Sequence, residues 1–186
     1  MARIEYINDV NGSFQEAHGS DNRLNTSARS DNRAYYNSRD EGRCFTLAYD
    51  HQGAVAGEFS VYWQNTDTTG RDLVISSVGL NSVQASRIKL QFVTGTAAGG
   101  TVVTPVNTNG SKSNAASATC RQAASGDPVT GLTTAGTLDF AWVQATGHEE
   151  MRLSDRIRLG QNDAIALRYD EGTTGDFAGV IFAYYE

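Results

Sequence analysis

Apolar and polar side chains alternate along much of the chain from residue 44 onward. In residues 59–63 Phe, Val and Trp occupy every second position, and in residues 88–92 Ile, Leu and Phe do the same. This period of two is typical of β-strands with one buried face. Comparable runs, bounded by turn-forming clusters, predict further strands at 44–49, 73–78, 138–143, 151–159, 165–169 and 177–185. Of these, 151–159 fits neither the strand nor the helix period well.

The stretch from residue 95 to residue 136 is dominated by small residues and contains the turn-forming pairs Gly99-Gly100 and Asn109-Gly110. A structureless loop of this length is unusual inside one domain, so the stretch is expected to contain further elements. We place short strands at 101–106 and 116–121, joined across Asn109-Gly110 by a turn or a longer loop.

Many short strands with turn signals between them, and no sustained helical period, predict an all-β fold. The architecture we expect is an antiparallel β-sandwich of jelly-roll type over residues 44–186. A Greek-key sandwich of immunoglobulin type is the alternative, although its Cys…Trp…Cys pattern is not reproduced. Trp63 and Trp142 both lie in alternating runs and are predicted to be core residues.

Residues 1–43 are too polar to form a core of their own. They hold six Arg against seven Asp and Glu, and the sequence Ser-Asp-Asn-Arg at 20–23 recurs at 30–33. One interpretation is a flexible tether. The other is an extended N-terminal arm that becomes ordered on a partner, where Arg and Tyr are the usual anchors. The residues we assign to that contact are Arg23, Arg33, Tyr35, Tyr36 and Arg39.

The last predicted strand, 177–185, is apolar on both faces. A sandwich strand needs only one buried face, and a second exposed apolar face favours aggregation. We therefore expect a contact between copies of the chain that involves Phe177, Val180, Phe182 and Tyr184, since closed homo-oligomers are common. A loop or the N-terminal arm covering this face is the alternative.

Composition and charge limit the classes of partner. The 186 residues carry 15 Lys and Arg against 21 Asp and Glu, a formal net charge of −6, which argues against general nucleic-acid binding. No run approaches ~18 consecutive apolar residues, so no membrane span is expected. The first residues lack the pattern of a secretory signal, and none is expected.

No catalytic or metal-binding motif stands out. His18, His51 and His148 are isolated in sequence, which predicts surface or loop histidines rather than a metal site. Acid pairs such as Asp170-Glu171 are more typical of solvated turns than of a hydrolase. Cys44 and Cys120 are expected to be buried thiols rather than a disulfide. We expect no cofactor, no metal and no enzymatic activity.

Several segments resemble a class of tailed-bacteriophage virion proteins. The first are residues 30–43 leading into Cys44-Phe-Thr-Leu, and the stretch Val61-Tyr-Trp-Gln-Asn-Thr with Leu73-Val-Ile. The most specific is Gly95-Thr-Ala-Ala-Gly-Gly-Thr-Val-Val-Thr-Pro-Val-Asn-Thr-Asn, followed by Asn114-Ala-Ala-Ser-Ala-Thr. The last is the ending Gly160…Ala164-Ile-Ala-Leu…Gly179-Val-Ile-Phe-Ala-Tyr-Tyr-Glu. Together they cover most of residues 30–186. The resemblance is to jelly-roll head-accessory or decoration proteins and to related tail-associated structural proteins.

The resemblance implies a non-enzymatic structural protein, often a homotrimer, on the exterior of a capsid. Its partners would be the major capsid protein or other virion proteins, with no nucleic acid and no membrane, and it would be made in the host cytoplasm. A tail- or collar-associated location is an alternative. A receptor- or carbohydrate-binding adhesin is another, because jelly rolls also serve as lectins, and exposed Trp and Tyr would support it.

Overall fold

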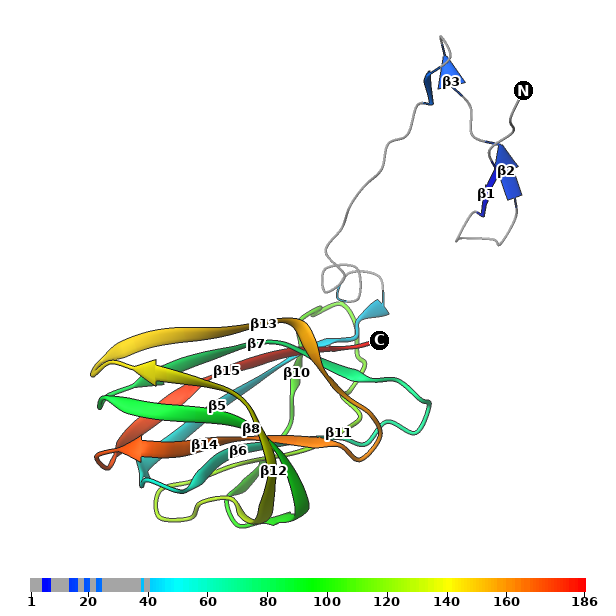
Figure 1. Ribbon diagram of the computed structural model, residues 1–186. Helices are drawn as coiled ribbons and strands as arrows, with labels where there is room; N and C mark the ends of the chain where they lie inside the picture. The colour runs from blue at the N-terminus through cyan, green and yellow to red at the C-terminus, as the bar shows by residue number, and fades with distance from the viewer. Residues whose placement is uncertain (1–4, 8–13, 17–18, 21–22, 25–37, 39–40) are drawn as a thin grey trace. The chain divides into compact units, whose positions relative to one another are not determined.

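The computed structural model describes residues 5–7, 14–16, 19–20, 23–24, 38 and 41–186 (Figure 1). The chain divides into two units, Met1–Asn32 and Arg33–Glu186. In the first unit, β1 (Glu5–Ile7) pairs antiparallel with β2 (Phe14–Glu16), and β3 (Gly19–Ser20) pairs antiparallel with β4 (Arg23–Leu24).

The second unit is built from strands arranged in two sheets. Eight are long: β5 (Cys44–Ala54), β6 (Phe59–Asn65), β7 (Leu73–Ser82), β8 (Ser86–Ala98), β12 (Thr130–Val143), β13 (Gly147–Leu159), β14 (Ala164–Gly172) and β15 (Gly175–Tyr185). Three are short: β9 (Thr101–Val103), β10 (Val106–Asn107) and β11 (Ala118–Gln122). One sheet has the order β10-β5-β15-β7-β13 and the other the order β12-β8-β14-β6-β11-β9.

The pairing of the long strands follows a nested order. The first long strand, β5, pairs with the last, β15, and the second, β6, pairs with the second from last, β14. In the same way β7 pairs with β13 and β8 pairs with β12, all antiparallel. A long hairpin rolled into two layers gives this nesting, which is that of a jelly roll. The predicted all-β jelly-roll sandwich is therefore confirmed, and the immunoglobulin-type alternative is not the fold.

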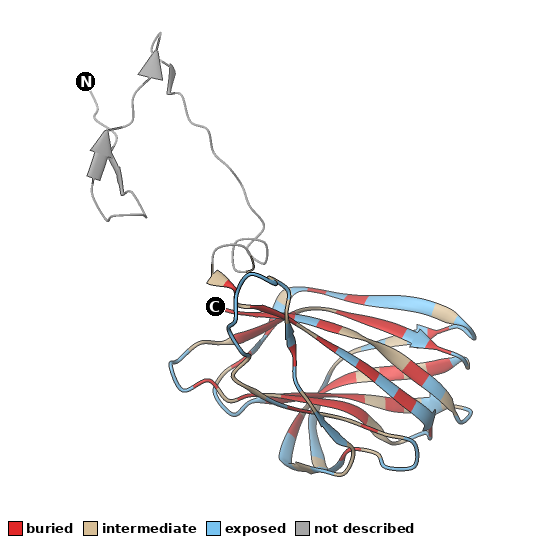
Figure 2. Ribbon diagram, turned by 180° about the vertical axis from the view of Figure 1, so that it is seen from behind, coloured by how far each residue is buried: buried red, intermediate tan, exposed pale blue. Residues whose placement is uncertain are grey.

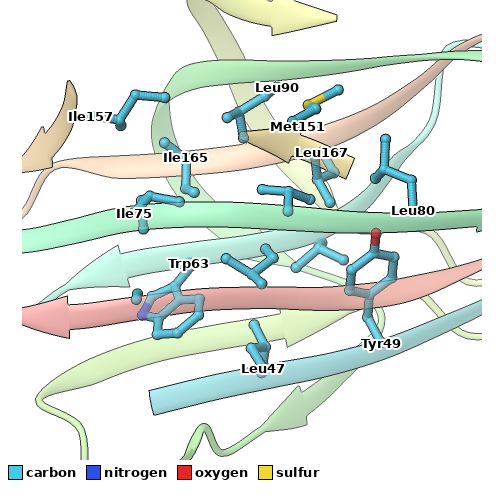
Figure 3. Packing of buried hydrophobic residues seen from close by; sticks show 14 of the residues in the cluster. Leu47, Tyr49, Trp63, Ile75, Leu80, Leu90, Met151, Ile157, Ile165 and Leu167 are labelled. Atoms are coloured by element: carbon cyan, nitrogen blue, oxygen red, sulfur yellow. The ribbon is translucent and has the colours of Figure 1, made fainter. Parts of the chain in front are cut away.

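Side chains from both sheets meet in one core between the layers. Leu47 and Tyr49 of β5 lie in the same cluster as Trp63 of β6 and Ile75 of β7 (Figure 3). Along the strands, buried residues alternate with exposed or half-buried ones (Figure 2). The period-two pattern of the sequence thus corresponds to the inward and outward faces of the sheets.

The small-residue stretch contains strands, as expected, but their pairing is split between the sheets. β9 pairs with β11 in one sheet, whereas β10 pairs with β5 in the other. Pro105 lies between β9 and β10 and has no backbone N–H to donate, which suits the point where the chain leaves one sheet for the other. The same stretch also supplies the first half of β12, which begins at Thr130 rather than at residue 138.

The irregular pattern of residues 151–159 has a backbone cause. The pairing of β13 with β7 shifts between Arg152 and Ile157. Within this bulge Ser154 and Asp155 adopt left-handed backbone conformations, with φ of 49° and 58°. A bulge moves the following side chains out of the original alternation, so a single period does not fit the whole strand.

Candidate functional surfaces

The arm residues fall mostly outside the part of the chain that the structure describes. Arg23 is the first residue of β4. Arg33, Tyr35, Tyr36 and Arg39 lie outside the described residues, so their assignment to a contact stays a prediction.

The segment that leads into the sandwich is tied to the loop that follows β10. Ser38 Oγ lies 2.9 Å from Thr108 Oγ1, and the Asn109 side chain donates to the carbonyl of Ser38 at 2.8 Å. Asn107 and Asn114 donate their side-chain amides to the carbonyl of Gly42. The sandwich therefore holds the chain at Ser38 and at Gly42, before β5 begins at Cys44.

The predicted interface residues of β15 do not share one face. Phe177 is fully buried in the core, where its ring centroid lies 5.3 Å from that of Tyr49. The sequence prediction that placed Phe177 at a contact with another copy is therefore corrected. Val180 is half-buried and Phe182 is 41% exposed on the outer face. Tyr184 is also on that face but is buried beside Cys44 and Val74.

A groove runs along this outer face next to Phe182. Its volume is about 350 Å³, and its lining includes Ser38, Cys44, Phe182 and Tyr184. The apolar outer face of β15 is thus partly covered near its C-terminal end and open at Phe182. Among the residues predicted for a subunit contact, Phe182 is the most exposed, with Val180 beside it.

His51 corrects another expectation from the sequence. It is buried in β5 on the face that carries Leu47 and Tyr49, and is not a surface or loop histidine. Its Nδ1 lies 2.9 Å from Oγ of Ser60, and its Nε2 lies 3.5 Å from a carboxylate oxygen of Glu58. Burial lowers the pKa of His51, and the nearby charges of Glu58 and Asp50 oppose this change only in part.

The Ser60–His51–Glu58 contacts have the order of a catalytic triad but not its accessibility. Ser60 and His51 are 0% and 1% exposed, so no substrate reaches the serine oxygen in this conformation. Buried polar groups need hydrogen-bond partners, and the contact between Ser60 and His51 gives each side chain one. This need explains the arrangement. His148, by contrast, is exposed and contacts Asn81 through Nδ1 at 3.0 Å.

A network of charged side chains lies on the outer face of the sheet that contains β8 and β14. The Asp170 carboxylate accepts from Arg87 Nε at 2.8 Å and forms an ion pair with Lys89 Nζ at 2.9 Å. Glu171 adds a second carboxylate 3.0 Å from Arg87. Burial alone would raise the pKa of Asp170, but the hydrogen bonds from Lys89 and Arg87 outweigh it and lower the pKa.

Two exposed aromatic side chains on β12 adjoin this network. Trp142 is 52% exposed and Phe140 is 57% exposed. The alternation predicted Trp142 to be in the core, but its indole lies under the guanidinium of Arg87. The Arg87 Cζ atom is 5.4 Å from the centroid of the indole ring. We call the group of Phe140, Trp142, Arg87, Lys89 and Asp170 the aromatic ledge.

The two cysteines occupy different parts of the sandwich. Cys120 belongs to the main core, whereas Cys44 packs with Val74 and Tyr184. Both are thiols, as expected, and burial raises the pKa of each, that of Cys44 to about 11. Neither has the low thiol pKa typical of a reactive cysteine.

Within the described residues, no group of three or more His, Cys, Asp and Glu side chains is placed to hold a metal ion. No helix in that part of the chain is long and apolar enough to cross a membrane. The fold and its surfaces define the second unit as a β-sandwich of jelly-roll type. A scan against protein families, a search of curated proteins and a search of solved structures returned no match.

Proposed function

We propose that the protein is a non-enzymatic structural component of a tailed-bacteriophage virion that binds the outer surface of the head and stabilises it. The observation that carries the proposal is the resemblance of segments within residues 30–186 to head-accessory proteins, together with the jelly roll that residues 44–186 form. The segments of greatest resemblance, 95–109 and 114–119, run from the end of β8 into the insertion between β8 and β12.

Charge supports an external location. Residues 44–186 carry nine Lys and Arg against fourteen Asp and Glu, so the body is acidic. A surface of this sign is repelled by packaged DNA and is compatible with the outside of a capsid. Stabilisation would come from area buried across the seams between capsid subunits, and several copies acting together would add avidity.

Attachment is assigned to the N-terminal arm. Because the sandwich holds the chain at Ser38, the first unit, Met1–Asn32, can be removed without cutting that contact. The deletion leaves four of the predicted contact residues in place, and these are tested by substitution in pairs: Arg33, Tyr35, Tyr36 and Arg39. Self-association is assigned to the open part of the β15 outer face, at Phe182 and Val180.

The first experiment measures how many copies of this chain each purified particle holds, by quantitative mass spectrometry against the major capsid protein. A number comparable to that of the capsid protein supports the head location. A number matching a single ring of subunits moves the proposal to the tail or collar, and absence from the particle contradicts it.

The second experiment tests attachment by co-sedimentation with particles that lack the protein. We expect the full chain to sediment with particles, weaker binding when residues 1–32, which include Arg23, are deleted, and loss of binding when Tyr35 and Tyr36 are both replaced by Ala. Circular dichroism of each variant reports whether the sandwich remains folded. Undiminished binding by all variants would contradict the role of the arm.

The third experiment tests self-association by analytical ultracentrifugation. We expect Phe182→Asp to convert the oligomer to monomer, because it places a charge at the proposed apolar contact. Val102→Asp is the matched control, since Val102 is an exposed valine on the other sheet. A monomeric unsubstituted chain, or an oligomer that tolerates Phe182→Asp, would contradict this interface.

A further inference from the structure

The aromatic ledge combines two exposed aromatic rings with a network of charged side chains. Phe140 and Trp142 stand two residues apart on β12, opposite Lys89 and Arg87 of β8 in the register of the strands. Side chains two residues apart point to the same face of a sheet. The two rings and the charged network therefore occupy one continuous outer surface.

The position of the indole is fixed by its neighbours. The Arg87 guanidinium lies over Trp142, and Arg87 is itself held by Asp170 and Glu171. These contacts orient the ring without covering it, since half of Trp142 stays exposed. A preoriented aromatic side chain loses little conformational entropy when a ligand stacks on it.

The charged groups also retain unused hydrogen-bonding capacity. Within the described part of the chain, the hydrogen bonds and ion pairs of Asp170 all end on Oδ2, which leaves Oδ1 able to accept. Among the described residues Lys89 Nζ forms an ion pair with Asp170, which engages one of its three hydrogens and leaves two to donate. The ledge thus offers an acceptor and donors side by side, next to two apolar ring faces.

We propose that the aromatic ledge binds a neutral saccharide. A pyranose ring has an apolar C–H face, which would stack on Trp142 with the next unit of the chain toward Phe140. Its hydroxyl groups both donate and accept, so they would bind Asp170 Oδ1 and Lys89 Nζ without disturbing the existing ion pairs.

The same network disfavours other ligands. An anionic saccharide or a nucleic acid would gain no net electrostatic attraction here, because Asp170 and Glu171 neutralise Arg87 and Lys89. A protein partner that covered the aromatic ledge and excluded water from it would have to desolvate these charges, which is costly. A hydroxyl-rich ligand replaces the lost water contacts with hydrogen bonds of its own.

This inference is independent of the virion role, because the ledge contains none of the residues assigned to attachment or self-association. The test screens the full-length chain against an array of neutral oligosaccharides built from glucose, mannose, galactose or N-acetylglucosamine, with sulfated and sialylated glycans on the same array. Affinity for the neutral oligosaccharide with the strongest signal is then measured by isothermal titration calorimetry.

We expect binding of at least one neutral oligosaccharide, and a loss of about tenfold or more in affinity for Trp142→Ala, which corresponds to roughly 1.4 kcal/mol. Phe140→Ala and Asp170→Asn are expected to weaken the same binding. Trp142→Phe retains a stacking surface and is expected to lose less than Trp142→Ala. Val102→Ala is the control, since it shortens an exposed apolar side chain away from the ledge.

Three results would overturn the proposal. The first is no binding to any neutral glycan, and the second is binding that Trp142→Ala leaves unchanged. The third is binding confined to anionic glycans and abolished by salt. None of these results bears on co-sedimentation with particles, so failure of the saccharide site and failure of the virion role are distinguishable.

Discussion

His51 and Ser60 share a hydrogen bond in the interior of the sandwich, with 2.9 Å between Nδ1 of the imidazole and Oγ of the serine. The two residues come from β5 and β6, which belong to different sheets. The contact therefore links the two layers through a titratable group, and this makes the stability of the fold depend on pH.

We predict that stability falls as the pH drops below the ordinary histidine pKa of 6.5. Burial lowers the pKa of His51 in the folded chain, so the unfolded chain binds the proton first. Stability is complete above pH 6.5 and declines below it until the lowered folded pKa is reached. Urea unfolding at a series of pH values between 8 and 5 measures the slope of the free energy of unfolding against pH.

His51→Gln is the variant for this prediction. It removes the titratable group, and we expect a loss of about 1–3 kcal/mol at pH 8, because Ser60 loses a buried partner. Without the imidazole, the pH dependence of the free energy of unfolding just below pH 6.5 is expected to disappear. An equal slope in the variant and the unsubstituted chain would show that His51 does not control it.

A second prediction concerns the charged network around Asp170. Asp170→Asn leaves Arg87 and Lys89, both partly buried, without their shared carboxylate, and is expected to cost about 1.5–3 kcal/mol. Since the pKa of Asp170 is lowered below 3.8, its contribution is complete above pH 3.8 and is lost as the pH falls through the lower folded value. Urea unfolding at pH 7 and pH 3 measures both effects.

Glu171→Gln is the control for Asp170→Asn. Glu171 contacts the same arginine but its side chain is 57% exposed, and exposed ion pairs contribute little. We expect a change within about 0.5 kcal/mol. If the two substitutions have equal effects, burial of the Asp170 carboxylate is not what gives the network its stability.

The sequence pattern predicts the strands well because period two depends on local alternation, and it fails where both faces are apolar. Around Trp142, the neighbours Ala141 and Val143 are apolar too, so the alternation does not tell which face is inward. The structure turns Val143 to the core and Trp142 outward. β15 is also apolar on both faces, so the alternation does not tell which of its faces is inward. For this reason the sequence placed Phe177 at a contact between copies rather than in the core.

Other features depend on contacts between distant parts of the chain. The pair Arg87–Asp170 joins residues 83 positions apart and appears only when β8 and β14 become neighbours. His51, in contrast, has a signal in the sequence: it continues the inward series of Phe45, Leu47 and Tyr49. Extending that alternation by two residues would have placed it in the core.

A third prediction distinguishes the two tryptophans by fluorescence. Trp63 is fully buried and Trp142 is half exposed, so iodide should quench only the second. We expect Trp142→Phe to abolish quenching, to shift the emission to shorter wavelength, and to change stability by about 0.5 kcal/mol or less. Val102→Ala, which leaves both indoles in place, is the control. Equal quenching before and after Trp142→Phe would contradict the outward position of Trp142.

A fourth prediction concerns Gly179 of β15, which lies between β5 and β7 in one sheet. A Cβ atom there would lie 2.0 Å from the carbonyl oxygen of Gly79 and 2.5 Å from Oη of Tyr49. That hydroxyl donates to the same carbonyl at 3.1 Å, so neither group can move without losing a buried hydrogen bond. We expect Gly179→Ala to cost about 3 kcal/mol or more, because both neighbours would have to shift.

Gly136→Ala is the matched control, because Gly136 also lies in a strand but has no atom within 4 Å of the added methyl group. There the substitution reduces the entropy of the unfolded chain without a clash, and we expect a change between zero and a gain of about 1 kcal/mol. Urea unfolding of the two variants side by side measures the difference. Similar costs at both positions would mean that loss of glycine flexibility, rather than the close approach of β15 to Gly79 and Tyr49, controls stability here.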